Sequence, residues 1–153
     1  MTDTLPDAGF AGKEYPATAP YVVGREKLRE FAAAVGAQHP AHFDTEVARG
    51  LGYPDVVAPT TFAVVVAQAA EAQYVQDPAA RIDFSRVVHA DERFTHHRPI
   101  VAGDELVTVL HVDAVVHRAG IALVTTRCEI RTADGGEPVS TVVSTLAVRG
   151  EAA

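Results

Sequence analysis

Two histidines on one expected loop are the residues of this sequence best suited to move protons. His39 and His42 lie in the segment A-Q-H-P-A-H-F, which also contains Pro40 and follows an expected helix. Histidine has an unperturbed pKa of about 6.5, so its ring can accept or donate a proton near neutral pH. The pair therefore indicates general acid–base chemistry. The alternatives are structural: His42 would be a buried, hydrogen-bonded ring, and His39 would face solvent.

Other residues that could bind a metal or act as a nucleophile have simpler explanations. His89, His96 and His97 suggest a metal site, but adjacent histidines on a strand point to opposite faces and cannot bind one ion together. The single cysteine, Cys128, has apolar residues at alternating positions, which indicates a small core residue and not a nucleophile. We therefore expect no metal and no cofactor.

Three charged residues also have structural interpretations. Asp44 and Asp55 lie near the histidines and could act as an acid, but their positions predict a helix cap and a turn. Arg98 could bind a phosphate group, although a surface ion pair is the simpler role.

The composition predicts one folded domain without nucleic-acid or membrane partners. The 153 residues are 48% hydrophobic, which is enough for a sizeable core, and the net charge of −7 opposes binding to a phosphate backbone. No apolar run is long enough to span a bilayer and nothing resembles a signal peptide, so we expect a cytoplasmic protein. We expect a flexible tail over 1–12, a single domain over 13–149 and a short tail over 150–153.

Helices are expected in the first half of the chain and strands in the second. Apolar residues at helical spacing predict a helix over 25–36, and weaker signals predict a short helix over 45–49. A third helix, from about Thr60 to Gln76, is apolar nearly all round, which is typical of a helix enclosed by other elements. Alternating and β-branched residues predict a short entry strand and then four longer ones, over 15–23, 87–97, 105–117, 121–131 and 139–148.

This order predicts an α+β fold in which a long antiparallel sheet wraps the apolar helix. A single sheet has open edges, so pairing of two copies, or of two related chains, would complete it.

Several motifs in this order resemble those of the MaoC-like hot dog dehydratases, also called (R)-specific enoyl thioester hydratases. Their motif places G-D-x-N-P-hydrophobic-H after an aromatic residue, and Gly36, Pro40 and His42 match its glycine, proline and histidine. The later stretch R-P-I-V-A-G-D-E-L, residues 98–106, is similar to R-P-V-x-x-G-D-x-L of the same family. The resemblance covers residues 14–148.

The sequence departs from the family at the catalytic positions. Ala37 stands where these enzymes have aspartate, and His39 stands where they have asparagine. In the later A-H-G-M element, Pro59 and Thr60 replace the histidine and the glycine. This version is similar to the degenerate subunit of mycobacterial-type (3R)-hydroxyacyl-ACP dehydratases, a group that includes uncharacterised actinobacterial proteins. In those heterodimers the companion chain carries the aspartate and histidine.

The resemblance implies a dimeric hot dog fold and a subunit of a (3R)-hydroxyacyl-thioester dehydratase, or enoyl hydratase in reverse. The substrate would be an acyl-ACP or acyl-CoA thioester, and the chain would shape the acyl pocket as a homodimer or beside a MaoC-type partner. It implies His42, and less strongly His39, as catalytic residues, and as substrate-binding residues Pro40, Thr60, Thr61 and Phe62.

Dehydration needs two proton transfers, and this chain has lost one of the family's two groups for them. Histidine suits removal of the C2 proton, whereas the family aspartate delivers a proton to the departing hydroxyl. Ala37 cannot do so, although His39 could in principle. We therefore expect activity only with a partner. The alternatives are a nonenzymatic acyl-binding homodimer and a hot dog thioesterase, for which Glu71 is the only acid well inside the apolar helix.

Overall fold

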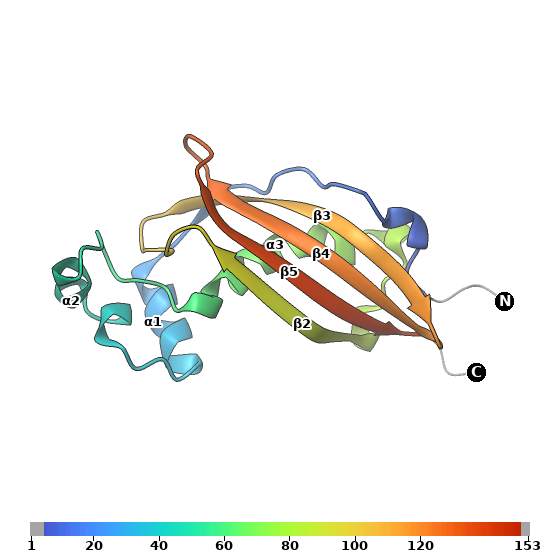
Figure 1. Ribbon diagram of the computed structural model, residues 1–153, viewed down its shortest axis with the longest axis horizontal. Coiled ribbons are helices and arrows are strands. Elements are labelled where there is room, and N and C mark those ends of the chain that lie inside the picture. The colour runs from blue at the N-terminus through green and yellow to red at the C-terminus, as the bar shows by residue number, and fades with distance from the viewer. Residues whose placement is uncertain (1–4, 151–153) are drawn as a thin grey trace.

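A curled antiparallel sheet wraps one helix in the computed structural model, which describes residues 5–150 (Figure 1). The sheet has the strand order β1-β3-β4-β5-β2, so β1 and β2 are its edges. The strands are β1 Tyr21–Val22, β2 Val87–His96, β3 Glu105–Arg118, β4 Ile121–Thr132 and β5 Pro138–Arg149. The helices are α1 Arg25–Ala34, α2 Thr45–Gly50 and α3 Ala63–Val75. This is the expected α+β hot dog fold.

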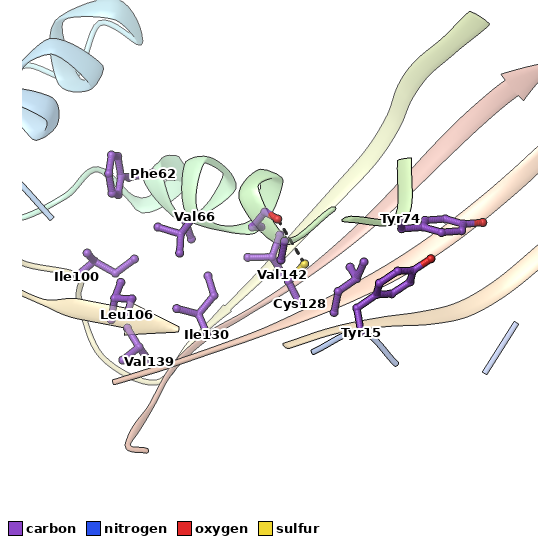
Figure 2. Packing of buried hydrophobic residues seen from close by; sticks show 14 of the residues in the cluster. Tyr15, Phe62, Val66, Tyr74, Ile100, Leu106, Cys128, Ile130, Val139 and Val142 are labelled. Atoms are coloured by element: carbon purple, nitrogen blue, oxygen red, sulfur yellow. Dashed lines mark hydrogen bonds between the residues drawn. The ribbon is translucent and has the colours of Figure 1, made fainter. Parts of the chain in front are cut away.

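The wrapped helix is α3, and its burial follows from its lack of a polar face. It begins after a 3₁₀ turn, η3, at Thr60–Phe62. Its side chains pack on the inner face of the sheet, where Figure 2 shows Val66 above Ile130. Cys128 is fully buried, and its Sγ donates to the carbonyl of Ala67 across 3.7 Å. The prediction that Cys128 is a core residue is therefore confirmed.

The four long strands begin and end within two residues of their predicted bounds. Period-two alternation is strong in β3, β4 and β5 because one face of each of these strands is buried and the other is mostly half-buried. The turn between β3 and β4 places both Ala119 and Gly120 at positive φ, 50° and 76°. Gly36, at φ 71°, ends α1 as predicted.

The entry segment over 15–23 forms less strand than predicted. Only Tyr21–Val22 is regular strand, although the amides of Tyr15 and Thr18 also bond β3 carbonyls, at 2.9 and 3.0 Å. Pro16 and Pro20 lack amide donors, so the ladder cannot continue through them.

The segment expected as an N-terminal tail lies partly outside the described residues, which begin at Leu5. From there it packs against the domain. The amide of Asp7 donates to the carbonyl of Ala80 at 3.0 Å, and the Phe10 ring lies 5.8 Å from that of Tyr74. These residues cover the end of α3, so the packed domain extends beyond residue 13 towards the N-terminus. At the other end Gly150 bonds Gly120 at 3.0 Å, and 151–153 lie outside the described residues.

Within residues 5–150, no helix has both the length and the apolar character needed to cross a bilayer.

Candidate functional site

The histidine loop is held in shape by two side-chain caps. It forms a 3₁₀ turn, η2, at Pro40–His42, and the Nδ1 atom of His39 accepts the amide hydrogen of Ala41 at 3.1 Å. Asp44 then caps α2 by accepting from the amide of Glu46 at 2.8 Å. The predicted capping role of Asp44 is confirmed, and its carboxylate is committed to the helix start.

The ring of His42 is oriented by the backbone of the segment that leads to α3. Its Nδ1 lies 2.7 Å from the carbonyl oxygen of Val57. A carbonyl oxygen only accepts, so Nδ1 carries the hydrogen and Nε2 of the neutral ring keeps its lone pair. The ring is half-buried and lies 6.2 Å from that of His39, which is exposed. His42 therefore has one nitrogen available as a base.

His42 lines a cavity of about 430 Å³, here called the His42 cavity. It lies between the start of the α3 segment and the end of β2 with the loop that follows. Its walls are His42, Tyr53, Val57, Ala58, Pro59, Thr60, His96, His97, Arg98, Pro99 and Ile100. None of these lining residues is acidic.

The structure brings only two of the predicted site residues to this cavity, His42 and Thr60. His39, Pro40 and Thr61 are exposed and do not line it. Phe62 is fully buried, and its ring packs edge-on against Phe31 with 5.3 Å between centroids. Its position is that of a core residue and not of a cavity wall.

Most of the wall was not predicted as part of the site. Tyr53 gave no signal in the sequence, whereas His96 lies two residues before the second motif and Arg98 is its first residue. His96 Nδ1 lies 3.0 Å from the hydroxyl of Ser140. Arg98 makes the expected ion pair, with two nitrogens 2.9 and 3.0 Å from the carboxylate of Asp104, and this pairing raises the pKa of Arg98. Within the described chain, no three His, Cys, Asp or Glu side chains gather as a metal site.

Asp55, the other acid near the loop in the sequence, also makes its contacts outside the His42 cavity. Asp55 accepts hydrogen bonds from Arg25, the shortest at 2.7 Å, and these lower the pKa of Asp55. Ala37 adds no titratable group. The His42 cavity thus has a candidate base but no carboxylate to act as the acid.

A second and larger cavity of about 570 Å³ lies between the other half of α3 and the start of β2; it is called the α3–β2 cavity here. Its walls are mostly apolar, but Glu71 reaches it from α3 and His89 from β2. Its full lining is Gln68, Glu71, Ala72, Val75, Gln76, Phe84, Val87, His89 and Leu146.

Residues 9–142 match the family model described as "FAS1-like, dehydratase domain region". The chain belongs to this family. A UPF0336 protein of Saccharopolyspora erythraea is 53% identical over 146 residues, which cover 95% of this chain and 93% of that protein. A UPF0336 protein of Clavibacter michiganensis is also 53% identical, over 92% of this chain and 93% of its own.

Solved structures place the domain among the MaoC-like hot dog proteins. A chain of the HadBC (3R-hydroxyacyl-ACP dehydratase) complex from Mycobacterium tuberculosis matches with a TM-score of 0.78 and 36% identity, over 90% of this chain and 96% of that one. A MaoC-like dehydratase matches with a TM-score of 0.82 and 36% identity, over 92% of this chain and 42% of that one. The R-hydratase PhaJ1 of Pseudomonas aeruginosa shares the fold, at 18% identity and a TM-score of 0.68, over 92% of this chain and 83% of that one.

Proposed function

We propose that this chain is a subunit of a (3R)-hydroxyacyl-thioester dehydratase that acts on acyl-ACP or acyl-CoA in fatty-acid-type metabolism. It would form the acyl pocket beside a MaoC-type partner that supplies the missing acid. The proposal rests mainly on the His42 cavity, which has a histidine with a free Nε2 and no carboxylate in its wall. The likeness to a chain of the HadBC complex supports it.

The residues of the cavity suit one half of the reaction. His42 Nε2 could take the C2 proton of a thioester, which would leave negative charge on the thioester oxygen. The first amides of a helical turn have no intrahelical acceptor, and Thr60, at the start of η3, lines the cavity. The departing hydroxyl still needs a proton that Ala37 cannot give. His39 as a substitute acid, and Pro40, Thr61 and Phe62 as binding residues, have weaker support because none lines the cavity.

The sheet edge suggests where a partner would join. β2 is an edge strand, and an edge strand can pair with another chain. Phe84, in the 3₁₀ turn just before β2, and Val88, the second residue of β2, are 73% and 64% exposed. We also propose that the protein is located in the cytoplasm.

Hydration of crotonyl-CoA tests the function directly. The purified chain would be assayed alone, and then with a copurifying chain that carries an intact G-D-x-N-P-x-H motif. We expect turnover only in the mixture. Release of free coenzyme A would instead indicate a thioesterase, and binding without turnover in any mixture would indicate the nonenzymatic acyl-binding homodimer.

A further inference from the structure

A buried carboxyl group on the central helix has no part in the proposed dehydratase chemistry. Glu71 is only 6% exposed, yet it lines the α3–β2 cavity. Its Oε1 accepts a hydrogen bond of 2.9 Å from the hydroxyl of Thr126, which is its only hydrogen bond among the described residues. An ionised carboxylate has several acceptor positions, so Glu71 can accept further donors from the cavity side.

The opposite wall places more polar groups close to this carboxylate. Nε2 of His89 contacts the carboxylate of Glu92 on the same strand. Burial raises the pKa of Glu92, and the nearby charge of Glu71 acts in the same direction. Glu71, Thr126, His89 and Glu92 are called the Glu71 cluster here. The cluster is rich in acceptors and poor in donors.

The remaining walls favour an aliphatic ligand. Ala72, Val75, Val87 and Leu146 line the cavity, Phe84 adds an exposed aromatic ring, and Gln68 and Gln76 are the two polar residues of these walls. A purely apolar chain that filled this space would displace water from Glu71 and give no donor in return. Loss of a donor to a buried carboxyl group is unfavourable even though Thr126 still donates to it, whereas a ligand hydroxyl would replace the hydrogen bond of the displaced water.

Both cavities lie between α3 and β2, at different points along the helix. Thr60 and His96 line the His42 cavity, whereas Glu71 and His89 line the α3–β2 cavity. At a rise of 1.5 Å per residue, Glu71 lies about 16 Å along the helical segment from Thr60. We take an acyl chain held beside His42 to run along α3, so that a short acyl group would end before Glu71 and a long one would meet it.

We propose that Glu71 makes the α3–β2 cavity selective for acyl chains that carry a hydroxyl group at the position that reaches Glu71. The hydroxyl would donate to the carboxylate of Glu71 while the chain packs on the apolar walls. An unsubstituted acyl chain of equal length would bind less well. This inference rests on the proposed function, because it takes the two cavities to hold one acyl thioester.

Calorimetric titration of the purified full chain with two matched probes tests this selectivity. The probes are dodecanoyl-CoA and ω-hydroxydodecanoyl-CoA, which differ only in the terminal hydroxyl. We expect the hydroxylated probe to bind the wild type at least about tenfold more tightly, because a site built for a hydroxyl discriminates against ligands that lack it. Equal affinities, or no binding of either probe, would overturn the inference.

Variants of Glu71 then assign the preference to this side chain. Glu71→Leu should reverse the order of the two probes. Glu71→Gln keeps the shape and an acceptor for Thr126, so it should fold in the same way and show a smaller preference than the wild type. Glu30→Gln, at a side chain that is 74% exposed on α1, should bind as the wild type does. An unchanged preference in both Glu71 variants would assign selectivity elsewhere and contradict the proposal.

The result can be separated from a failure of the proposed function. The crotonyl group is too short to reach Glu71, so hydration of crotonyl-CoA by the complex reports on the function alone. Turnover of crotonyl-CoA without a probe preference would reject the Glu71 inference only. A probe preference without turnover in any mixture would reject the dehydratase function and leave the selective cavity in place.

Discussion

The Nδ1 atom of His42 and the carbonyl oxygen of Val57 lie 2.7 Å apart, and this contact orients the imidazole. The same two segments are joined a second time, because the amide of Val57 donates to the carbonyl of Ala41 at 3.0 Å. Two hydrogen bonds therefore hold the loop and the approach to α3 together. The backbone fixes both the tautomer and the direction of His42.

Loss of this ring should affect both stability and turnover. His42→Ala removes one hydrogen bond to a buried backbone carbonyl, and we expect the free energy of unfolding to fall by about 1 kcal/mol. In an active complex, we expect kcat for crotonyl-CoA hydration to fall more than KM rises if His42 transfers the proton. Denaturant titration and steady-state kinetics measure the two effects.

His39→Ala is the matched control, because that ring is exposed and lies outside the cavity wall. It should leave the kinetics unchanged and reduce stability less. An unchanged hydration rate in the His42→Ala complex would assign His42 to structure alone.

Restoring the missing acid should give the isolated chain some activity. Ala37→Asp places a carboxylate on the same loop as His42, at the position of the family aspartate. We expect hydration of crotonyl-CoA by this variant to exceed that of the wild-type chain at least tenfold, since a placed acid or base contributes about 10²–10⁴ in rate. The double variant with His42→Ala should return to the wild-type level. Complete inactivity of Ala37→Asp would show that the loop does not approach the substrate.

Phe62 should act through the core and not through substrate contact. It is fully buried against Phe31, so Phe62→Ala should lower the free energy of unfolding by about 3–5 kcal/mol. Phe84, which is 73% exposed, provides the control, and Phe84→Ala should change stability by no more than about 0.5 kcal/mol. Thermal or denaturant unfolding distinguishes the two. A Phe62→Ala chain with wild-type stability and impaired acyl binding would favour the substrate-binding role instead.

The fold was predictable because its main signals are local. The enclosed helix follows from apolar residues on all its faces, and the strands follow from alternation along β3 and β4. The site was less predictable, because its walls come from segments far apart in the sequence. Tyr53 has no pattern that marks it, and Phe62, although next to Thr61 in a motif, turns into the core. Local signals do not specify which way such a side chain points.

The packing of the N-terminal segment against the domain could not be predicted from the sequence either. Residues 5–12 have no strong periodicity, so the sequence suggested a tail. Their contacts with α3 and its following turn are long-range, and they include Phe10 on Tyr74. The burial of Tyr74, with nearby acidic charges, raises its pKa to about 12. A tail and a docked segment differ only in contacts that a local pattern does not encode.

The carboxylate of Asp77 joins this N-terminal region to the end of α3, and it should make stability dependent on pH. It lies 3.1 Å from Nζ of Lys13 and accepts a 2.9 Å hydrogen bond from the hydroxyl of Tyr15. These contacts, with the amide of Ala79, lower the pKa of Asp77 in the folded chain. A carboxyl group with a lowered folded pKa binds its proton more weakly in the folded state than in the unfolded state. Its contribution is therefore complete above the unfolded value of about 3.9 and is lost as the pH falls through the folded value.

Asp77→Asn should accordingly lower Tm at pH 7 and lower it progressively less as the pH falls below about 4, where the wild type loses the same contribution. Thermal unfolding of both proteins across this range measures the difference. Asp134→Asn, in the exposed turn before β5, is the control and should track the wild type throughout. A Tm difference that stayed constant down to the lowest pH would show that Asp77 stabilises the chain without its charge. The N-terminal segment would then be held by its apolar contacts and backbone hydrogen bonds.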